Sequence, residues 1–229
     1  MINVIMLVYS SSEKVIDMTK RAIQSLYDSE PFHFNMIVVE SSENRVDYDV
    51  ENIIYFKGEF NYNAAINMCN NYLDEESEWL IITNNDVRFE RGWFSKILDV
   101  YDERTDIESF SPKCPFLYNT YYKDHFLGSE DAYKVSHKVT ECLMGWCLVM
   151  RMRVFKTLYP FDETFDMFYQ DNDYAEQLKL NGIKHALVRD SIVSHLGSLT
   201  VGEREFDKQK KMDEDFEKFK NKYPNYEDN

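Results

Sequence analysis

Glycine is scarce in this sequence, with 7 residues in 229, and none of the glycine-rich patterns that hold phosphates is present. Neither Gly-x-Gly-x-x-Gly nor Gly-x-x-x-x-Gly-Lys occurs, which argues against a dinucleotide-dependent dehydrogenase and against a P-loop NTPase. The Gly-x-Ser-x-Gly pattern is missing as well, so the usual serine hydrolase triad is not expected.

Cysteine and long apolar runs are also rare. The spacing of Cys69, Cys114, Cys142 and Cys147 matches no metal finger. Cys142 and Cys147 flank a short apolar run, so buried thiols rather than a disulfide are expected there. No apolar run is long enough to cross a bilayer, and the short run Ile2–Val8 does not have the pattern of a signal peptide. These features predict a reduced, soluble, cytoplasmic protein without a transmembrane segment.

Positive charge is in the minority, and the net charge is −15. This balance disfavours nucleic acid or an anionic membrane as the main partner, although a local basic groove stays open. The hydrophobic content of 44% and the aromatic content of 15% are sufficient for a full core. The length fits one large domain, or one domain with an embellishment.

The first half of the sequence alternates between strand-like and helix-like patterns. Apolar runs predict strands at 2–8, 36–39, 53–56 and 79–83, and 3.6-residue periods predict helices from 13, over 61–73 and from 93. Ser10-x-x-Glu13 has the pattern of a capping box before the first helix. This order predicts a three-layer α/β/α fold with a mostly parallel central sheet and a Rossmann-like first half.

The second half is less regular. Residues 111–140 show no sustained period and predict a long loop or small subdomain. Order returns with a predicted strand over 143–150, a helix from Asp171 to a C-cap at Asn181-Gly182, and one or two strands over 184–193. A charged helix is predicted over 203–223, draped over the core.

Asp86 is the most informative polar residue, because it directly follows the apolar run Trp79–Ile82. The carboxyl end of a central strand is where open α/β sheets bind ligands, and a carboxylate oxygen suits Mg²⁺ or Mn²⁺. A simple capping role is the commoner fate of such an Asp. Other polar residues at strand ends or helix starts are Glu40, Asn61, Asn63, Asp171 and Asp173. Together they could surround one nucleotide and one ion.

Asp171 is the second candidate. The helix dipole explains most acids in a first helical turn, but Asp171 follows the aromatic segment 165–169 and has a second acid at Asp173. A carboxylate beside an apolar wall can act as a general base. His195 could be a further metal ligand or a hydrogen-bonded surface residue. Trp146 could pack in the core or offer a platform for a sugar.

Five motifs in this order resemble those of family 2 glycosyltransferases with the GT-A fold. They are Phe60–Asn67, Thr83–Val87 followed by Gly92-Trp93, Gly145–Phe155 followed by Phe161-Asp162-Glu163, Asp171–Tyr174 with Gly182, and His195 with Ser198. The resemblance implies one GT-A domain over 1–200, with a nucleotide-sugar-binding half (1–110) and an acceptor and catalytic half (111–200). A charged C-terminal helix and tail would follow over 201–229.

The resemblance also implies an inverting, metal-dependent transfer of one sugar from a nucleotide-diphosphate sugar, preferably a UDP-sugar, to an acceptor hydroxyl. Asp86 would bind Mn²⁺ or Mg²⁺ with His195 as a further ligand, and Asp171 would be the catalytic base. The implied nucleotide-sugar residues are Tyr9, Ser10, Glu40, Asn61, Asn63, Asn84 and Asn85, with Glu40 on the base. The implied acceptor residues are Gly145, Trp146 and Asp173.

The sequence departs from the family pattern at several positions. Asn84 replaces the usual first acid of the metal motif, Gln170 replaces a common Glu, and Glu40 stands where Asp is commoner. Tyr159-Pro160 replaces the usual Gly-Gly. The Gln/Arg-x-x-Arg-Trp motif of processive synthases is missing, so addition of a single sugar is expected.

Two alternatives stay open at this point. A nucleotidyltransferase that makes nucleotide sugars would share the sheet, but it usually has a glycine-rich, basic loop where this sequence has Tyr9-Ser10-Ser11-Ser12. A non-catalytic nucleotide- or sugar-binding module is favoured by the reduced metal motif. The acceptor could be a glycan, a lipid-linked sugar, a protein or a modified nucleobase.

Overall fold

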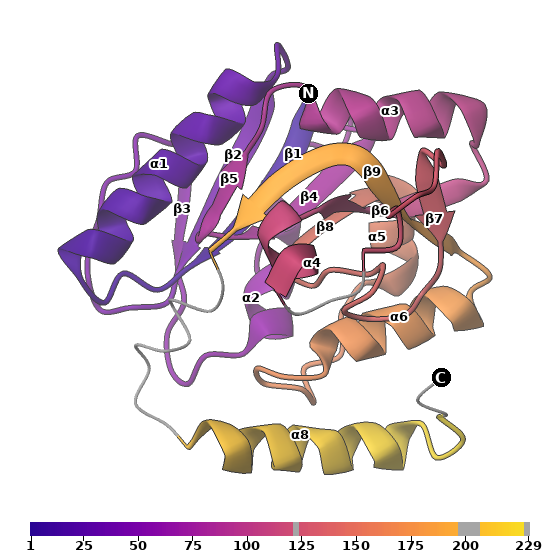
Figure 1. Cartoon of the computed structure of the whole chain (residues 1–229). Helices are drawn as coiled ribbons and strands as arrows, with labels where there is room; N and C mark the ends of the chain where they lie inside the picture. The colour runs from indigo at the N-terminus through magenta and orange to yellow at the C-terminus, as the bar shows by residue number, and fades with distance from the viewer. Residues whose placement is uncertain (121–123, 197–206, 227–229) are drawn as a thin grey trace.

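The computed structural model describes residues 1–120, 124–196 and 207–226. Within these ranges nine strands form one mixed sheet in the order β3-β2-β1-β4-β8-β6-β9-β5, and β7 also pairs with β9 (Figure 1). The strands are β1 (Ile2–Val8), β2 (Phe34–Glu40), β3 (Asn52–Tyr55), β4 (Trp79–Asn84), β5 (Val87–Phe89), β6 (Ile107–Lys113), β7 (Tyr133–Val135), β8 (Cys147–Arg151) and β9 (Lys184–His195).

Helices cover both faces of this sheet. They are α1 (Glu13–Ser29), α2 (Tyr62–Asn67), the 3₁₀ helix η1 (Asn70–Tyr72), α3 (Trp93–Glu103), α4 (Pro115–Thr120), α5 (Met152–Leu158), α6 (Gln170–Leu180) and α8 (Lys208–Lys222). The predicted α/β fold is confirmed. The sheet is parallel from β3 through β2 and β1 to β4, whereas β8 is antiparallel to both of its neighbours, β4 and β6.

The core has two parts because successive strand side chains point to opposite faces of the sheet. On β1, Val4 and Met6 join the cluster beneath α1 and α3, while Ile5 and Leu7 join the cluster beneath α2, α5 and α6. All four side chains are buried. This two-sided burial explains the continuous apolar run, which is typical of a central parallel strand.

Several predicted boundaries differ from the structure. The helix predicted over 61–73 is α2 followed by η1. The strand predicted from 143 begins at Cys147, because the preceding residues form a turn closed by the Cys147 N–H on the Met144 carbonyl (3.0 Å). The segment 111–140, predicted as a loop or subdomain, includes the end of β6, α4 and β7.

The predicted N-cap of the first helix is wrong by two residues. Ser12 caps α1, and its side chain accepts the Val15 N–H at 3.4 Å. Ser10 instead bonds to Glu40 on the neighbouring strand, which is a long-range contact that a local capping pattern cannot reveal.

The four cysteines are free and buried, which confirms the thiols predicted at Cys142 and Cys147. Among the described ranges, none of the helices combines the length and the apolarity that crossing a bilayer requires.

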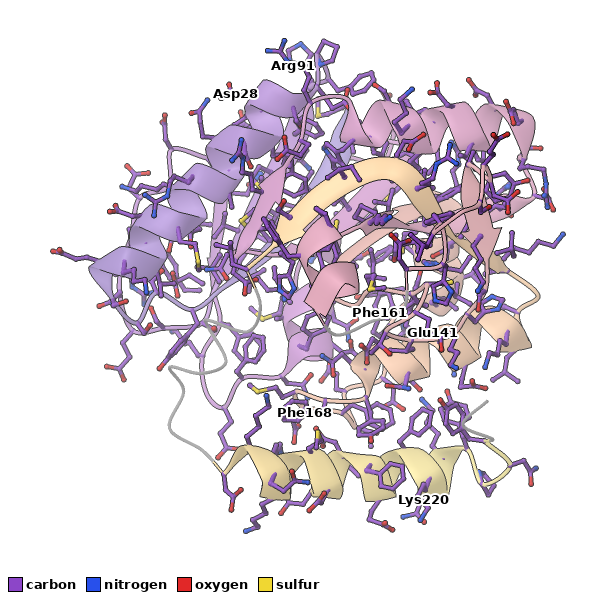
Figure 2. All side chains as sticks on the ribbon, viewed as in Figure 1. Asp28, Arg91, Glu141, Phe161, Phe168 and Lys220 are labelled. Atoms are coloured by element: carbon purple, nitrogen blue, oxygen red, sulfur yellow. The ribbon has the colours of Figure 1, made fainter. Side chains whose placement is uncertain are left out.

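The charged C-terminal helix is confirmed as α8, although residues 203–206 of the predicted span, like Ser198, lie outside the described residues. Figure 1 shows α8 (yellow) along the outer side of α6, at the edge of the molecule away from α1. Side chains that include Phe168 fill the layer between α8 and the body (Figure 2). Phe219 is the fully buried centre of this layer and packs on Phe165 with a centroid distance of 6.1 Å.

Candidate active site

The end of β4 brings Asp86 beside His195. Asp86 lies between β4 and β5, and β5 pairs antiparallel with the end of β9, where Val87 is opposite His195. The Leu196 N–H donates to the Asp86 carbonyl at 2.9 Å. As a result His195 Nε2 lies 3.1 Å from Asp86 Oδ1, and both side chains are buried. These two residues are far apart in the sequence, and the pairing of β5 with β9 brings them together.

Several buried polar atoms at this pair have no hydrogen-bond partner in the part of the chain that the structure describes. Asp86 Oδ1, both ring nitrogens of His195 and Trp146 Nε1 are buried and make no hydrogen bond there, because the 3.1 Å contact lacks hydrogen-bond geometry. The Trp146 ring stacks on the His195 ring, with 5.0 Å between the ring centroids and an interplanar angle of 11°. One face of the Trp146 ring is therefore covered by His195. Buried polar atoms without partners are costly and indicate a place for a ligand.

A divalent cation fits the Asp86–His195 pair. Two neighbouring ligands of an octahedral ion with bonds of about 2.1 Å lie about 3.0 Å apart, close to the 3.1 Å seen here. Over the described ranges, however, no cluster of three or more His, Cys, Asp or Glu residues could hold a metal. The protein would therefore supply two ligands, and water or a phosphate would have to complete the shell.

Asn84 and Asn85 have different surroundings. The Asn84 N–H donates to the Trp146 carbonyl at 2.9 Å, which ties the end of β4 to the residues before β8. The Asn85 side chain is buried and donates to Thr19 Oγ1 of α1 at 2.7 Å. Asn85 thus fixes the strand end against α1, and its predicted contact with a nucleotide sugar stays a prediction.

Glu40 is fully buried at the end of β2 and accepts four hydrogen bonds. The donors are the Ser10 N–H (3.2 Å) and the Ser42 N–H (2.8 Å) to Oε1, and the Ser10 hydroxyl (2.6 Å) and the Tyr48 hydroxyl (2.8 Å) to Oε2. A carboxylate has about four acceptor positions, so these donors fill them. Burial alone would raise the pKa of Glu40, but the hydrogen bonds from Ser10, Ser42 and Tyr48 outweigh it and lower that pKa.

The predicted contact of Glu40 with a nucleotide base is therefore untested, and it would have to replace one of these four bonds. Ser10 belongs to the same cluster, and Tyr9, partly buried, precedes it at the end of β1. Tyr48 was not predicted, because it lies outside any regular element and no local pattern marks it.

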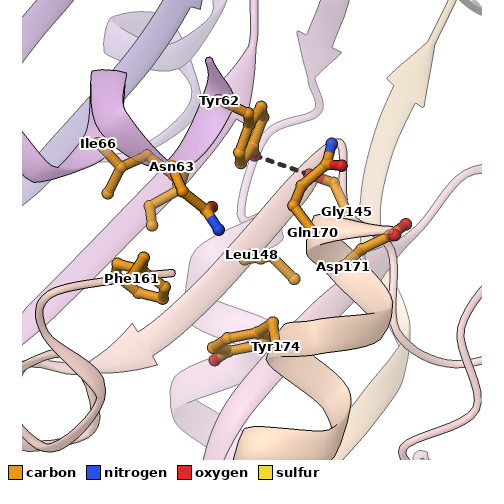
Figure 3. A pocket seen from close by; sticks show the side chains of 10 residues that line it. Tyr62, Asn63, Ile66, Gly145, Leu148, Phe161, Gln170, Asp171 and Tyr174 are labelled. Atoms are coloured by element: carbon orange, nitrogen blue, oxygen red, sulfur yellow. Dashed lines mark hydrogen bonds between the residues drawn. The ribbon is translucent and has the colours of Figure 1, made fainter. Parts of the chain in front are cut away.

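Asp171 lies in the first turn of α6 against Gly145. A Cβ on Gly145 would lie 2.9 Å from both Cβ and Oδ2 of Asp171, so only glycine leaves room for this carboxylate. The Gly145 carbonyl accepts the Tyr62 hydroxyl at 3.1 Å (Figure 3). Burial raises the pKa of Asp171, and the Asn172 N–H, at 3.0 Å, offsets this only in part. As a whole residue, Asp171 is partly buried and not closed off from solvent.

A narrow pocket adjoins Asp171 (Figure 3). Its lining is mostly apolar and includes Tyr62, Asn63, Phe161, Gln170 and Tyr174. The Tyr174 hydroxyl continues into a buried chain through Ser109 (2.8 Å) to His185 Nδ1 (2.8 Å). This chain was not predicted, because its members are far apart in the sequence.

Asn61 and Asn63 hold the segment that leads to α6. Asn61 caps α2 by accepting the Ala64 N–H at 2.8 Å, and its amide donates to the Glu163 carbonyl at 2.8 Å. The Asn63 amide donates to the Asp162 carbonyl at 2.7 Å. Both side chains therefore face residues 162–163, and the nucleotide-sugar role assigned to them stays a prediction.

Asp173, predicted on the acceptor side, faces α8. Its Oδ1 accepts Lys222 Nζ at 2.6 Å and the Tyr223 hydroxyl at 2.7 Å, and the side chain is buried. These contacts anchor the C-terminal helix. Sequence reasoning missed Lys222 and Tyr223, since a charged helix shows no sign of which cation will be paired across an interface.

The dipeptide Gly145-Trp146 joins the two centres. Gly145 packs on Asp171, while Trp146 stacks on His195, which in turn meets Asp86. The structure thus brings five predicted site residues, namely Asp86, Gly145, Trp146, Asp171 and His195, into one continuous set of contacts.

No family model matches this sequence, and no curated protein matches it. Similar solved structures do exist. The glycosyltransferase TarS (1-349) from S. aureus has a TM-score of 0.63 at 14% identity, over 96% of this chain and 72% of TarS. The mannosyltransferase PcManGT from Pyrobaculum calidifontis, in complex with GDP-Man and Mn²⁺, has a TM-score of 0.61 at 12% identity, over 85% of this chain and 56% of PcManGT.

A third similar structure is the inositol-1-phosphate CTP transferase from T. maritima, with a TM-score of 0.55 at 15% identity, over 95% of this chain and 97% of that protein. At sequence identities this low, the structural similarity shows a shared fold and does not show a shared reaction. The chain has a GT-A-like α/β fold, which glycosyltransferases share with a nucleotidyltransferase.

Proposed function

We propose that this protein is an inverting glycosyltransferase that moves one sugar from a nucleotide-diphosphate sugar to an acceptor hydroxyl. The observation that carries the proposal is the contact path from the Asp86–His195 pair through Trp146 and Gly145 to Asp171. Such a transfer needs a site for a leaving diphosphate and a base for the attacking hydroxyl, and the two must be close together.

In this proposal Asp86 and His195 hold a Mn²⁺ or Mg²⁺ ion on the donor diphosphate. The ion would supply charge stabilisation for the leaving nucleoside diphosphate. The family resemblance and the fold of the GDP-Man- and Mn²⁺-bound mannosyltransferase support this reading. Residues 1–110 would then contribute the donor half of a single domain over 1–200, and a UDP-sugar is the donor that we test first.

Asp171 would accept the proton of the acceptor hydroxyl. The carboxylate already has a raised pKa because of its burial, and a higher pKa makes a carboxylate a stronger base. Residues 111–200 would form the acceptor half, with Gly145, Trp146 and Asp173 nearby. We propose a glycan, a lipid-linked sugar, a protein or a modified nucleobase as the class of acceptor.

The proposal is tested by incubating the protein with Mn²⁺ and UDP-, GDP- or dTDP-sugars and measuring release of the free nucleoside diphosphate, with water as the acceptor that takes the sugar. Thermal shift with the same donors identifies the base that binds. We expect release with one donor, and its loss in Asp171→Asn and in Asp86→Ala. Donor binding should survive in Asp171→Asn. Transfer at the wild-type rate by Asp171→Asn would overturn the role of Asp171.

The same assay separates the two alternatives. Pyrophosphate released from a nucleoside triphosphate and a sugar phosphate would favour a nucleotidyltransferase, a class represented among the structures with this fold. Donor binding that is unchanged by Mn²⁺ and by EDTA, without turnover, would favour a non-catalytic binding module.

A further inference from the structure

Asp215 is a fully buried carboxylate on α8, whose residues are mostly charged and whose other fully buried side chain is Phe219. Its Oδ2 accepts the backbone N–H groups of Met167 (3.3 Å) and Phe168 (3.1 Å). Its Oδ1 pairs with Lys218 Nζ at 3.0 Å. A buried charge persists only where it is paired and hydrogen-bonded, so Asp215 fixes the backbone of residues 167–168 against α8.

The next residue, Tyr169, has an unusual backbone conformation. Its φ is +64°, in the left-handed region, and it forms the N-cap of α6 without a side-chain capping bond. This conformation is unfavourable for a residue other than glycine. The Tyr169 ring packs on Phe216 (5.3 Å between centroids) and on Phe219 (5.5 Å) of α8. The same helix therefore holds both the backbone before Tyr169 and its ring.

The position of Asp171 depends on this turn. The Tyr169 carbonyl accepts the Asp173 N–H at 2.8 Å and so begins α6, and Asp171 lies within that first turn. Asp171 has little room to move, because Gly145 lies against its side chain. A small change in the backbone of 167–169 would rotate the first turn and displace the carboxylate.

We propose that Asp215 is a positioning residue for Asp171, acting through the backbone of Met167 and Phe168 and the turn at Tyr169. The inference rests on the proposed function, in which Asp171 is the base. It makes α8 a part of the active-site architecture. The competing view is that Asp215 only attaches α8 and affects stability alone.

The test uses Asp215→Asn in the full-length protein. Asn has the same size, but it cannot pair with Lys218 in the same way and can present an N–H₂ group to the two N–H donors. Asp213→Asn is the matched control, because Asp213 is exposed on the same helix and accepts a hydrogen bond from the Gln209 side-chain amide at 2.8 Å. Phe216→Ala is a milder second variant, which removes the ring beside Tyr169 and serves if Asp215→Asn does not fold.

Four quantities are measured: kcat and donor KM for sugar transfer, the melting temperature, and the titration midpoint of the Asp171 carboxyl by ¹³C NMR. A displacement of about 1 Å can cost about 100-fold in rate, so we expect Asp215→Asn to lower kcat by about 10- to 100-fold with donor KM within about twofold. The Asp171 midpoint should fall toward that of an ordinary Asp. The control should match the wild type in kcat and in the midpoint.

A lower melting temperature with unchanged kcat and an unchanged Asp171 midpoint would overturn the inference. The NMR arm does not require turnover. If the wild type transfers no sugar at all, the proposed function fails, whereas a midpoint that still moves in Asp215→Asn supports the positioning of Asp171 by α8. A midpoint that does not move overturns it.

Discussion

Gly145 packs so closely on Asp171 that a Cβ at position 145 would lie 2.9 Å from the Asp171 Cβ and from its Oδ2. Such distances are shorter than van der Waals contact, and the second atom is the carboxylate oxygen itself. The chain at 145 and the first turn of α6 therefore fit together only without a side chain, which makes position 145 a sensitive probe of Asp171.

Gly145→Ala should displace the Asp171 carboxylate and lower sugar transfer by about 10- to 100-fold, because catalysis is sensitive to a shift of about 1 Å. Donor binding by calorimetry should change little. The control is a double-mutant cycle with Asp171→Asn. If the alanine acts through Asp171, its effect on residual transfer should be small in that background, and an equal effect in both backgrounds would contradict the prediction.

Asp171→Asn should raise the free energy of unfolding at neutral pH while it leaves only a small residual rate of transfer. Burial raises the pKa of Asp171, so the folded state binds this proton more tightly than the unfolded state does. The stability of the wild type relative to the variant should therefore increase as the pH falls through the folded pKa, and level off below the unfolded value. Urea unfolding of both proteins from pH 3.5 to 8 measures this difference in the free energy of unfolding. A pH-independent difference would show that the carboxyl is not perturbed.

Tyr48→Phe should lower the free energy of unfolding at pH 7 by about 1–3 kcal/mol, because it removes one donor from the buried Glu40 carboxylate. The lowered pKa of Glu40 means that its contribution is present above its unfolded pKa and is lost as the pH falls through the folded pKa. The loss caused by Tyr48→Phe should accordingly shrink in acid.

Tyr55→Phe provides the matched control for Tyr48→Phe. Tyr55 is on the neighbouring strand β3, and its ring, which lies 3.8 Å from the Arg45 guanidinium, is retained in the variant. Urea unfolding of both variants over the same pH range makes the comparison. An equal loss of stability for the two would argue against a special role of the Glu40 cluster.

The apolar strands and the residues at their ends could be read from the sequence. Ile2–Val8 and Trp79–Ile82 are buried on both faces of the sheet, which leaves a strong local pattern, and Asp86 follows the second of these directly. The start of α6 near Asp171 was equally clear. In each case the sequence pattern lies within a single strand or helix and does not depend on which other segments pack against it.

The hydrogen-bond partners of the polar side chains could not be predicted from local sequence patterns. The predicted Ser10 cap is a Glu40 partner, Asp173 is paired with α8, and Asn63 holds the chain at Asp162. Each of these outcomes depends on which distant segment packs alongside. An Asn, Ser or Asp has similar sequence surroundings whether it binds a ligand or the protein's own backbone.

The metal site gives the last prediction. Asp86→Ala and His195→Ala should each weaken Mn²⁺ binding by about tenfold or more, because each removes one of the two ligand atoms that this pair would supply, and no cluster of three or more such residues occurs in the described ranges. Arg88→Ala is the control, since its side chain is 72% exposed on the adjacent strand β5. Binding of Mn²⁺ is followed by electron paramagnetic resonance, with and without nucleoside diphosphate. Because two protein ligands leave most of an octahedral shell to water or phosphate, the diphosphate should tighten Mn²⁺ binding to the wild type. Mn²⁺ binding that is insensitive to both substitutions would place the ion elsewhere.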